Sequence, residues 1–166
     1  VLIQAIVPRV IRWMMTANYH LWWIGWLWNV TPPILVYHDE RDSGAVRETI
    51  KHLKDGDIVG IFPEGGLNRD KDSFLEFSPG VAMIARRSGA SVVPVYVTDT
   101  PRLESPLLSL LVPSRSRVIF GEPFTVEKTT DRDAILAEIR TRIEALRARY
   151  GSGADASDEA RESEQA

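Results

Sequence analysis

The sequence predicts an α/β fold in which helices flank a largely parallel central sheet. Apolar runs of strand length at 34–37, 58–62 and 91–97 alternate with segments of helical periodicity at 43–54 and 80–88. Strands that alternate with helices are joined by crossover connections, so they pair in parallel. The composition agrees, since 44% hydrophobic and 26% charged residues are typical of a globular chain. At 166 residues the chain is long enough to bury the core of one domain.

The first elements surround a dense group of tryptophans. Residues 1–7 predict the end of a helix whose start lies upstream, and residues 9–15 predict a strand after the break at Pro8. Because the chain begins without Met, we expect an excised or truncated piece. The apolar segment 21–30 is too short to span a bilayer. It contains Trp22, Trp23, Trp26 and Trp28, which we expect to contact the membrane interface, with packing into the core as the alternative.

Two helices in the middle of the chain have clear ends. The segment 43–54 is amphipathic, and Gly56 suits the left-handed residue that terminates a helix. The helix at 80–88 is preceded by Ser78 and Pro79, which are suited to the N-cap and to the first helical position. A glycine directly after this second helix closes it.

The C-terminal part continues the pattern and ends in a polar tail. A strand is predicted at 117–120, and the capping box at 130–133 opens a long amphipathic helix that Gly151 ends. We therefore assign residues 1–150 to one domain. The small and acidic residues 151–166 are expected to be disordered.

Composition excludes several classes of site. The chain has no cysteine, so a disulfide framework, a thiolate nucleophile and a cysteine-ligated zinc ion are all excluded. The formal net charge of −3 comes from the acidic tail 151–166, which leaves the rest of the chain close to neutral. A protein that binds nucleic acid needs a markedly basic face, so nucleic acid is not expected as a partner.

The most informative stretch follows the strand at 58–62. Pro63 lacks the backbone donor that a ladder needs and therefore stops the strand. Gly65 allows a sharp turn, which leaves the carboxylate of Glu64 at the carboxyl end of the strand, with Arg69 about a turn away. Ligands bind at such strand ends in open α/β sheets. The alternative is an ordinary turn with a solvated acid.

The block Phe62-Pro63-Glu64-Gly65 resembles the FPEG block of the glycerolipid acyltransferases, which include the lysophosphatidate and lysophospholipid acyltransferases. In the common form Thr-Arg-Ser follows, whereas this chain continues with Gly66-Leu67-Asn68 and carries its arginine at Arg69. Val93-Pro94-Val95 resembles the late block of the same family. The resemblance covers roughly residues 1–125 and implies a glycerol-3-phosphate acyltransferase-like fold.

The resemblance also implies a reaction. It is the transfer of a fatty acyl group from an acyl-CoA or acyl-ACP thioester to the hydroxyl of a lysophospholipid such as 1-acylglycerol-3-phosphate, in phospholipid biosynthesis. The thioester is a co-substrate, and neither a cofactor nor a metal ion is implied. The implied partners are the two substrates and a membrane surface, on the cytoplasmic face of the cell membrane. A fusion partner domain in the parent protein is a further possibility.

The resemblance also implies roles for individual residues, when the family's site residues are matched to this chain by position. Those implied to hold the acceptor and its phosphate are Glu64, Gly65, Arg69, Arg41 and His38, and those implied to be structural are Phe62, Pro63 and Pro94. The two arginines would hold the phosphate through charge-assisted hydrogen bonds, with His38 as a weaker contributor. Glu64 would orient the glycerol hydroxyl or brace an arginine. The alternative for Arg41 is a surface ion pair with a neighbouring aspartate.

The family's catalytic base is a His-x-x-x-x-Asp motif, which the resemblance places just ahead of Val1. Within the chain only His52 and Asp57 match this spacing. The helical pattern turns His52 away from the core and Asp57 lies past the helix end, so we expect a solvated surface histidine. His20 lies beside the tryptophans and is expected to be an interfacial or a packing residue. We therefore expect the chain alone to be inactive, and a lipid-binding module without catalysis is the alternative function.

Overall fold

The computed structural model describes most of the chain outside the tryptophan-rich segment and the acidic tail. The described residues are 2–16, 32–36, 43–66, 68, 73–98 and 116–151. The predictions made for other positions lie outside these residues, namely those for His20, Trp22, Trp23, Trp26, Trp28, His38, Arg41, Arg69 and the tail after Gly151.

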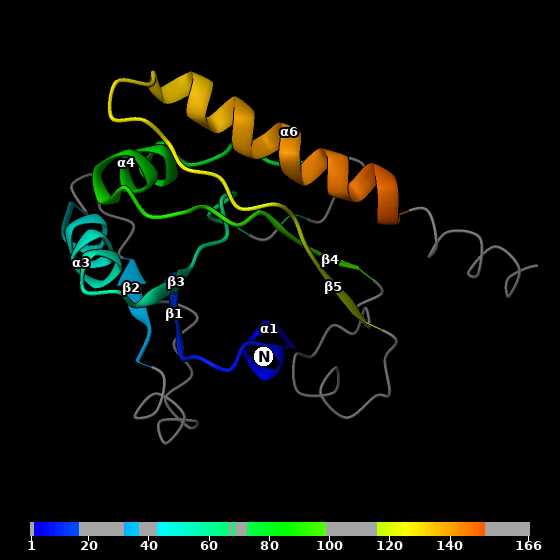
Figure 1. Cartoon of the computed structure of the whole chain (residues 1–166), viewed down its shortest axis with the longest axis horizontal. Coiled ribbons are helices and arrows are strands. Elements are labelled where there is room, and N and C mark those ends of the chain that lie inside the picture. Colours follow the sequence, from blue (N-terminus) through cyan, green and yellow to red (C-terminus); the bar gives the residue numbers. More distant parts are fainter. Residues whose placement is uncertain are drawn as a thin grey trace, which may run out of the picture. The chain divides into compact units, whose positions relative to one another are not determined.

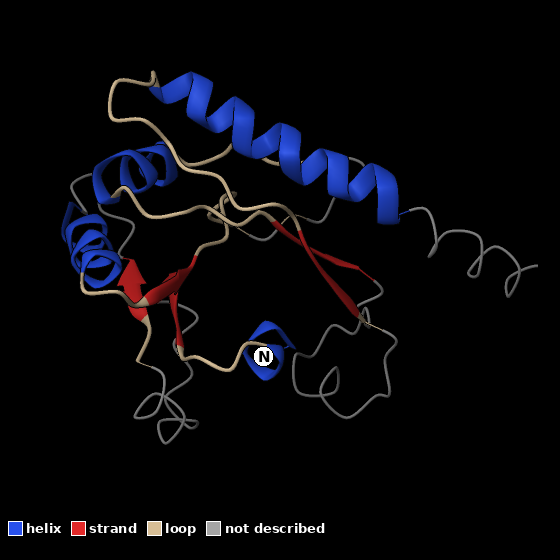
Figure 2. Ribbon diagram, viewed as in Figure 1, coloured by secondary structure: helices blue, strands red, loops and turns tan. Residues whose placement is uncertain are grey.

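A parallel sheet of three short strands organises the first part of the chain (Figure 2). The central strand is β1 (Ile11–Thr16), with β2 (Ile34–Val36) on one side and β3 (Ile58–Gly60) on the other. Both neighbours run parallel to β1, as the alternation of strands and helices predicted. β3 is shorter than the predicted 58–62, since its pairing with β1 ends at Gly60, three residues before Pro63.

Three helices accompany this sheet (Figure 1). They are α1 (Leu2–Ile6), α3 (Ser43–Lys54) and α4 (Pro79–Ser88). The bounds of α3 agree with the prediction, and its end is followed by Gly56 at φ 89°. The side chain of Ser78 caps α4, and Gly89 closes it in the left-handed conformation at φ 70°. α3 and α4 pack against each other.

The remaining elements are an antiparallel pair and a long helix. β4 (Val95–Thr98) pairs antiparallel with β5 (Arg117–Phe120), and α6 spans Arg132–Tyr150. The strand predicted at 91–97 is interrupted, because Pro94 has no backbone donor and only a single bridge forms before it.

The predicted start of α6 is off by one residue. The capping box at 130–133 required Thr130 to be the N-cap, but the side chain of Asp131 accepts the hydrogen bond from Asp133 N at 3.0 Å. That hydrogen bond to the backbone of Asp133 is the largest cause that lowers the pKa of Asp131 below its ordinary value.

The chain divides into two compact units, each with its own buried residues. The first comprises Val1–Val92 with Phe124–Ala137, and the second comprises Val93–Pro123 with Glu138–Ala166. Buried apolar residues of the first unit are Ile11, Ile34, Ala45, Phe77, Ala82, Ile84, Ala85 and Ile135; those of the second include Pro94, Ile139 and Ile143. None of the described helices is long and apolar enough to cross a membrane.

Candidate functional site

The carboxyl ends of the three parallel strands define one edge of the sheet. The last residue of β3, Gly60, lies opposite Trp13, and the last residue of β2, Val36, lies opposite Thr16. β2 therefore extends three residues further along β1 than β3 does, roughly 10 Å at the rise of a strand. Because the strands are parallel, the segments that follow β2 and β3 leave from the same edge.

The segment after β3 forms a tight turn around Glu64. Gly65 N donates to Phe62 O at 3.1 Å, and Gly65 has φ 64°, a left-handed conformation that glycine adopts without strain. The carbonyl of Pro63 accepts a hydrogen bond from Ser78 N at 2.8 Å. This bond fastens the turn to the residue that caps α4, so the turn is held against the start of that helix.

Glu64 itself is half-buried and holds the following loop together. Its Oε2 atom accepts hydrogen bonds from Asn68 Nδ2 at 2.9 Å and from Leu75 N at 2.8 Å. Asn68 Nδ2 also donates to Ser73 O at 2.7 Å. The interpretation of Glu64 as a freely solvated acid is therefore wrong, because its carboxylate is tied to the backbone and side chain of its own loop.

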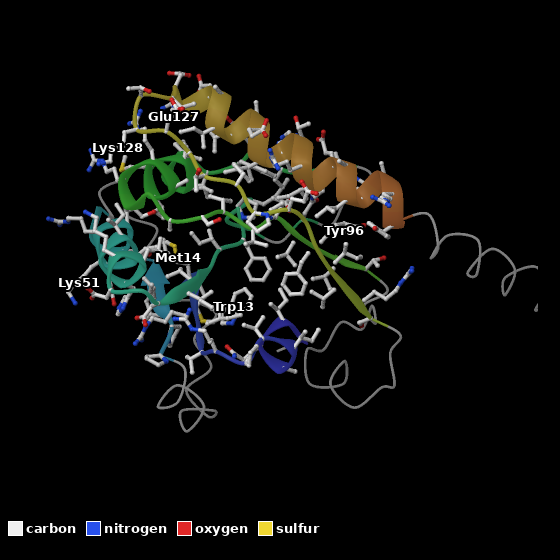
Figure 3. The ribbon with its side chains drawn as sticks, viewed as in Figure 1. Trp13, Met14, Lys51, Tyr96, Glu127 and Lys128 are labelled. Atoms are coloured by element: carbon white, nitrogen blue, oxygen red, sulfur yellow. The ribbon has the colours of Figure 1, made fainter. Side chains whose placement is uncertain are left out.

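An aromatic pair lies beside this turn. The rings of Trp13 and Phe62 stack with centroids 5.6 Å apart and planes 24° apart. Trp13 and Met14 extend to opposite sides of β1, as successive strand residues do (Figure 3). Gly60 leaves room for the indole, since a Cβ there would lie 2.5 Å from Trp13 Cε3. Phe62, predicted to be structural, makes this stack and still exposes 65% of its surface.

The structure therefore brings part of the predicted site together. Phe62, Pro63, Glu64 and Gly65 form one turn at the carboxyl end of β3. Pro94 belongs to the second unit, where it is buried and its carbonyl accepts from Gly121 N at 2.8 Å. The remaining members, His38, Arg41 and Arg69, lie outside the described residues. Among the described residues no group of three or more His, Asp or Glu is placed to hold a metal ion.

The prediction for His52 is wrong. Its side chain is only 20% exposed, and its Nδ1 lies 2.9 Å from Asp57 Oδ2. Because a carboxylate only accepts, Nδ1 carries the proton. The same oxygen accepts from Arg12 Nε at 2.9 Å. The Arg12 hydrogen bond, followed by the His52 hydrogen bond, lowers the pKa of Asp57 below its ordinary value.

This His–Asp pair resembles a catalytic pair in spacing, but it lies at the other end of β3. Asp57 directly precedes β3, whereas Glu64 follows its carboxyl end. The remaining ring nitrogen, His52 Nε2, is 3.9 Å from Glu48 Oε1 on the same helix. The pair therefore connects α3 to the amino ends of β1 and β3, and it does not serve the turn at Glu64.

Asn68 and Trp13 also contact the turn at Glu64, although the sequence did not indicate either contact. Asn68 has a local signal, since a side-chain amide four residues after a carboxylate can reach back to it across a loop. Trp13 has none, because its contacts with Gly60 and Phe62 come from pairing between strands that are distant in sequence.

Residues 1–98 of the chain match the protein-family model described as Acyltransferase. The chain belongs to the acyltransferase family. The match contains β1, β2, β3 and the turn at Glu64, so the edge described above is part of the acyltransferase region. A comparison with curated proteins finds no relative of the chain.

The acyltransferase fold is also found among solved structures. The crystal structure of the 1-acyl-sn-glycerophosphate (LPA) acyltransferase PlsC from Thermotoga maritima matches with a TM-score of 0.61 and 18% sequence identity. The match covers 82% of this chain and 56% of that chain, so the protein spans little more than half the length of the structure it resembles. At this identity the likeness shows the fold alone.

Proposed function

We propose that this protein is the acceptor-binding part of a glycerolipid acyltransferase. The whole acyltransferase would transfer a fatty acyl group from an acyl-CoA or acyl-ACP thioester to the hydroxyl of a lysophospholipid such as 1-acylglycerol-3-phosphate. The observation that carries the proposal is the family match over residues 1–98. The position of Glu64 supports it, since a half-buried carboxylate at the carboxyl end of a parallel strand is placed where α/β proteins bind ligands.

In the proposed reaction a base removes the acceptor's hydroxyl proton while the oxygen attacks the thioester carbonyl carbon. The carbon–sulfur bond then breaks, and the base returns the proton to the sulfur, so the leaving group departs as a thiol. Glu64 holds the acceptor, and Arg41, Arg69 and His38 bind its phosphate. The base comes from a His-x-x-x-x-Asp motif ahead of Val1, and on this proposal the chain alone is inactive. No cofactor takes part.

The acceptor and product are membrane lipids, which favours a site of action at the cytoplasmic face of the cell membrane. The tryptophans Trp22, Trp23, Trp26 and Trp28 are suited to this contact because indole favours the membrane–water interface. A fusion partner in the parent protein is compatible with the proposal.

Acyl transfer tests the proposal directly. The parent reading frame, including the sequence ahead of Val1, is supplied with labelled acyl-CoA and either 1-acylglycerol-3-phosphate or another lysophospholipid. We expect transfer, and we expect Glu64→Ala to lower kcat/KM by about 10- to 100-fold, the usual cost of losing a hydrogen bond to a charged group. Glu76→Ala, an exposed acid of the same loop, is the matched control and is expected to leave the rate unchanged. Absence of transfer with every acceptor refutes the proposal.

One observation favours a second function, a lipid-binding module without catalysis. The only His-x-x-x-x-Asp spacing in the chain, His52 to Asp57, is occupied in an ion-pair cluster with Arg12 away from Glu64. Binding to vesicles that contain 1-acylglycerol-3-phosphate, without acyl transfer by the parent protein, would establish this module instead.

A further inference from the structure

The hydrogen bonds of Glu64 make its two carboxylate oxygens unequal. Oε2 accepts from Asn68 Nδ2 at 2.9 Å and from Leu75 N at 2.8 Å. No described residue donates to Oε1. A carboxylate oxygen that already accepts two hydrogen bonds is saturated, so only Oε1 keeps acceptor capacity for a further donor.

The residue type at position 68 is dictated by this arrangement. Asn68 Nδ2 carries two hydrogens and has two acceptors within reach, Glu64 Oε2 at 2.9 Å and Ser73 O at 2.7 Å. A side-chain amide nitrogen satisfies both acceptors at once. Aspartate has the same shape but only oxygens, and it would place a second carboxylate against Glu64. Neither acceptor would then receive a hydrogen bond from position 68.

The contacts also explain how the two ends of the loop are held together. Asn68 joins Glu64 to Ser73, and Leu75 N reaches the same carboxylate oxygen from eleven residues further along the chain. The side chain of Glu64 is therefore held in one orientation from both ends of the loop. Removal of Asn68 leaves a single hydrogen bond on Oε2, about which the carboxylate can turn.

We propose that Asn68 is a positioning residue for acceptor binding. It holds Glu64 through Oε2, which leaves Oε1 as the oxygen that Glu64 presents to the bound lysophospholipid. The inference rests on the proposed function, since it names how that function's acceptor site is built. Asn68 acts through Glu64 and touches no reacting atom, so its effect belongs to the acceptor and not to the acyl thioester.

The test is a double-mutant cycle in the parent reading frame, with kcat and KM measured separately for 1-acylglycerol-3-phosphate and for acyl-CoA. The variants are Glu64→Ala, Asn68→Ala, the double variant and Asn68→Asp. We expect Asn68→Ala to reduce kcat/KM for the acceptor by roughly tenfold, as the loss of one charge-assisted hydrogen bond does. We expect the KM for acyl-CoA to stay unchanged. The double variant is expected to be no worse than Glu64→Ala, because Asn68 has no side chain at position 64 to hold once the carboxylate is removed.

Two further measurements separate positioning from simple loop stability. Ser78→Ala removes the side-chain cap of α4 but keeps the backbone N–H that donates to Pro63 O, so the turn at Glu64 stays fastened. This control is expected to lower thermal stability and to leave the acceptor KM unchanged. In Asn68→Asp two carboxylates adjoin, and a proton shared between them at low pH restores a hydrogen bond. The deficit of this variant is therefore expected to shrink as the pH is lowered, while that of Asn68→Ala does not.

The outcomes distinguish the inference from the function beneath it. If the wild-type parent transfers acyl groups and Asn68→Ala keeps its acceptor kcat/KM, the inference is overturned and the function stands. The same holds if the losses of Asn68→Ala and Glu64→Ala multiply in the double variant. If the wild-type parent transfers no acyl group to any acceptor, the proposed function falls and the inference falls with it.

Discussion

Replacing Gly60 with alanine tests the packing that supports the turn. A Cβ at Gly60 would lie 2.5 Å from Trp13 Cε3 and 2.6 Å from Cζ3, closer than real Cβ contacts. The indole must therefore retreat by about 1 Å to regain ordinary contact. Its stack on Phe62, with centroids 5.6 Å apart, is then disturbed as well. The substitution is expected to cost more than its small size suggests.

The magnitude follows from three contributions. Overpacking costs about 1–3 kcal/mol, and an aromatic pair contributes about 0.5–1.5 kcal/mol beyond its buried area. Alanine also reduces the conformational freedom of the unfolded chain, which stabilises the folded protein by about 0.4–1 kcal/mol and offsets part of this cost. We expect a net destabilisation of about 2 kcal/mol, which lowers Tm by about 4–8 °C for a chain of this size.

Thermal and urea unfolding, followed by circular dichroism, measure this cost. Gly66→Ala is the matched control, because its Cβ would lie 3.9 Å from Leu75 Cδ1, an ordinary contact. We expect the control to change stability by less than about 0.5 kcal/mol. In a Trp13→Leu background, Gly60→Ala is expected to lose most of its cost, because the clashing ring is gone. A Gly60→Ala variant as stable as wild type refutes the position of the Trp13 ring against Gly60 of β3.

Two other predictions concern α3 and its neighbours. Thr49 is fully buried, and its Oγ1 has no hydrogen-bond partner among the described residues. Thr49→Val is therefore expected to raise the free energy of unfolding by about 1 kcal/mol. Thr141 is exposed, so Thr141→Val is the control, and equal changes in the two variants contradict the reasoning. Hydrogen bonds from Arg12 and then His52 lower the pKa of Asp57 from its ordinary value of 3.8. The ionised carboxylate therefore stabilises the fold fully above pH 3.8, and this stabilisation is lost as the pH falls through the lower pKa of the folded state. Wild type is therefore expected to exceed Asp57→Asn in Tm at neutral pH and to converge with it in acid, whereas a constant difference would exclude the ion-pair cluster as its source.

Much of the local structure could be predicted because its signals are local. The bounds of α3 and β5 match the sequence pattern, since periodicity and flanking residues fix both. The left-handed glycines Gly56 and Gly89 and the cap at Ser78 were also predicted, because each acts on a backbone group within a few residues.

The contacts between distant segments could not be predicted this way. His52 meets Asp57 because the turn at Gly56 brings Asp57 N back to His52 O at 3.0 Å, and Arg12 joins them from a strand 45 residues away. A helical wheel gives the direction of His52 on α3 but not what the sheet places beside it. The prediction of a solvated histidine failed for that reason.

The same division holds for the candidate site. The sequence by itself determined the strand–turn block, the carboxylate of Glu64 at the strand's carboxyl end and the family that the block resembles, since all of these depend on adjacent residues. Only the tertiary structure decided that Oε2 of Glu64 is held by Asn68 and Leu75, and that Phe62 stacks on a tryptophan of β1. The physical reason is that hydrogen bonds and ring stacking depend on distances in space, which strand register and loop closure set.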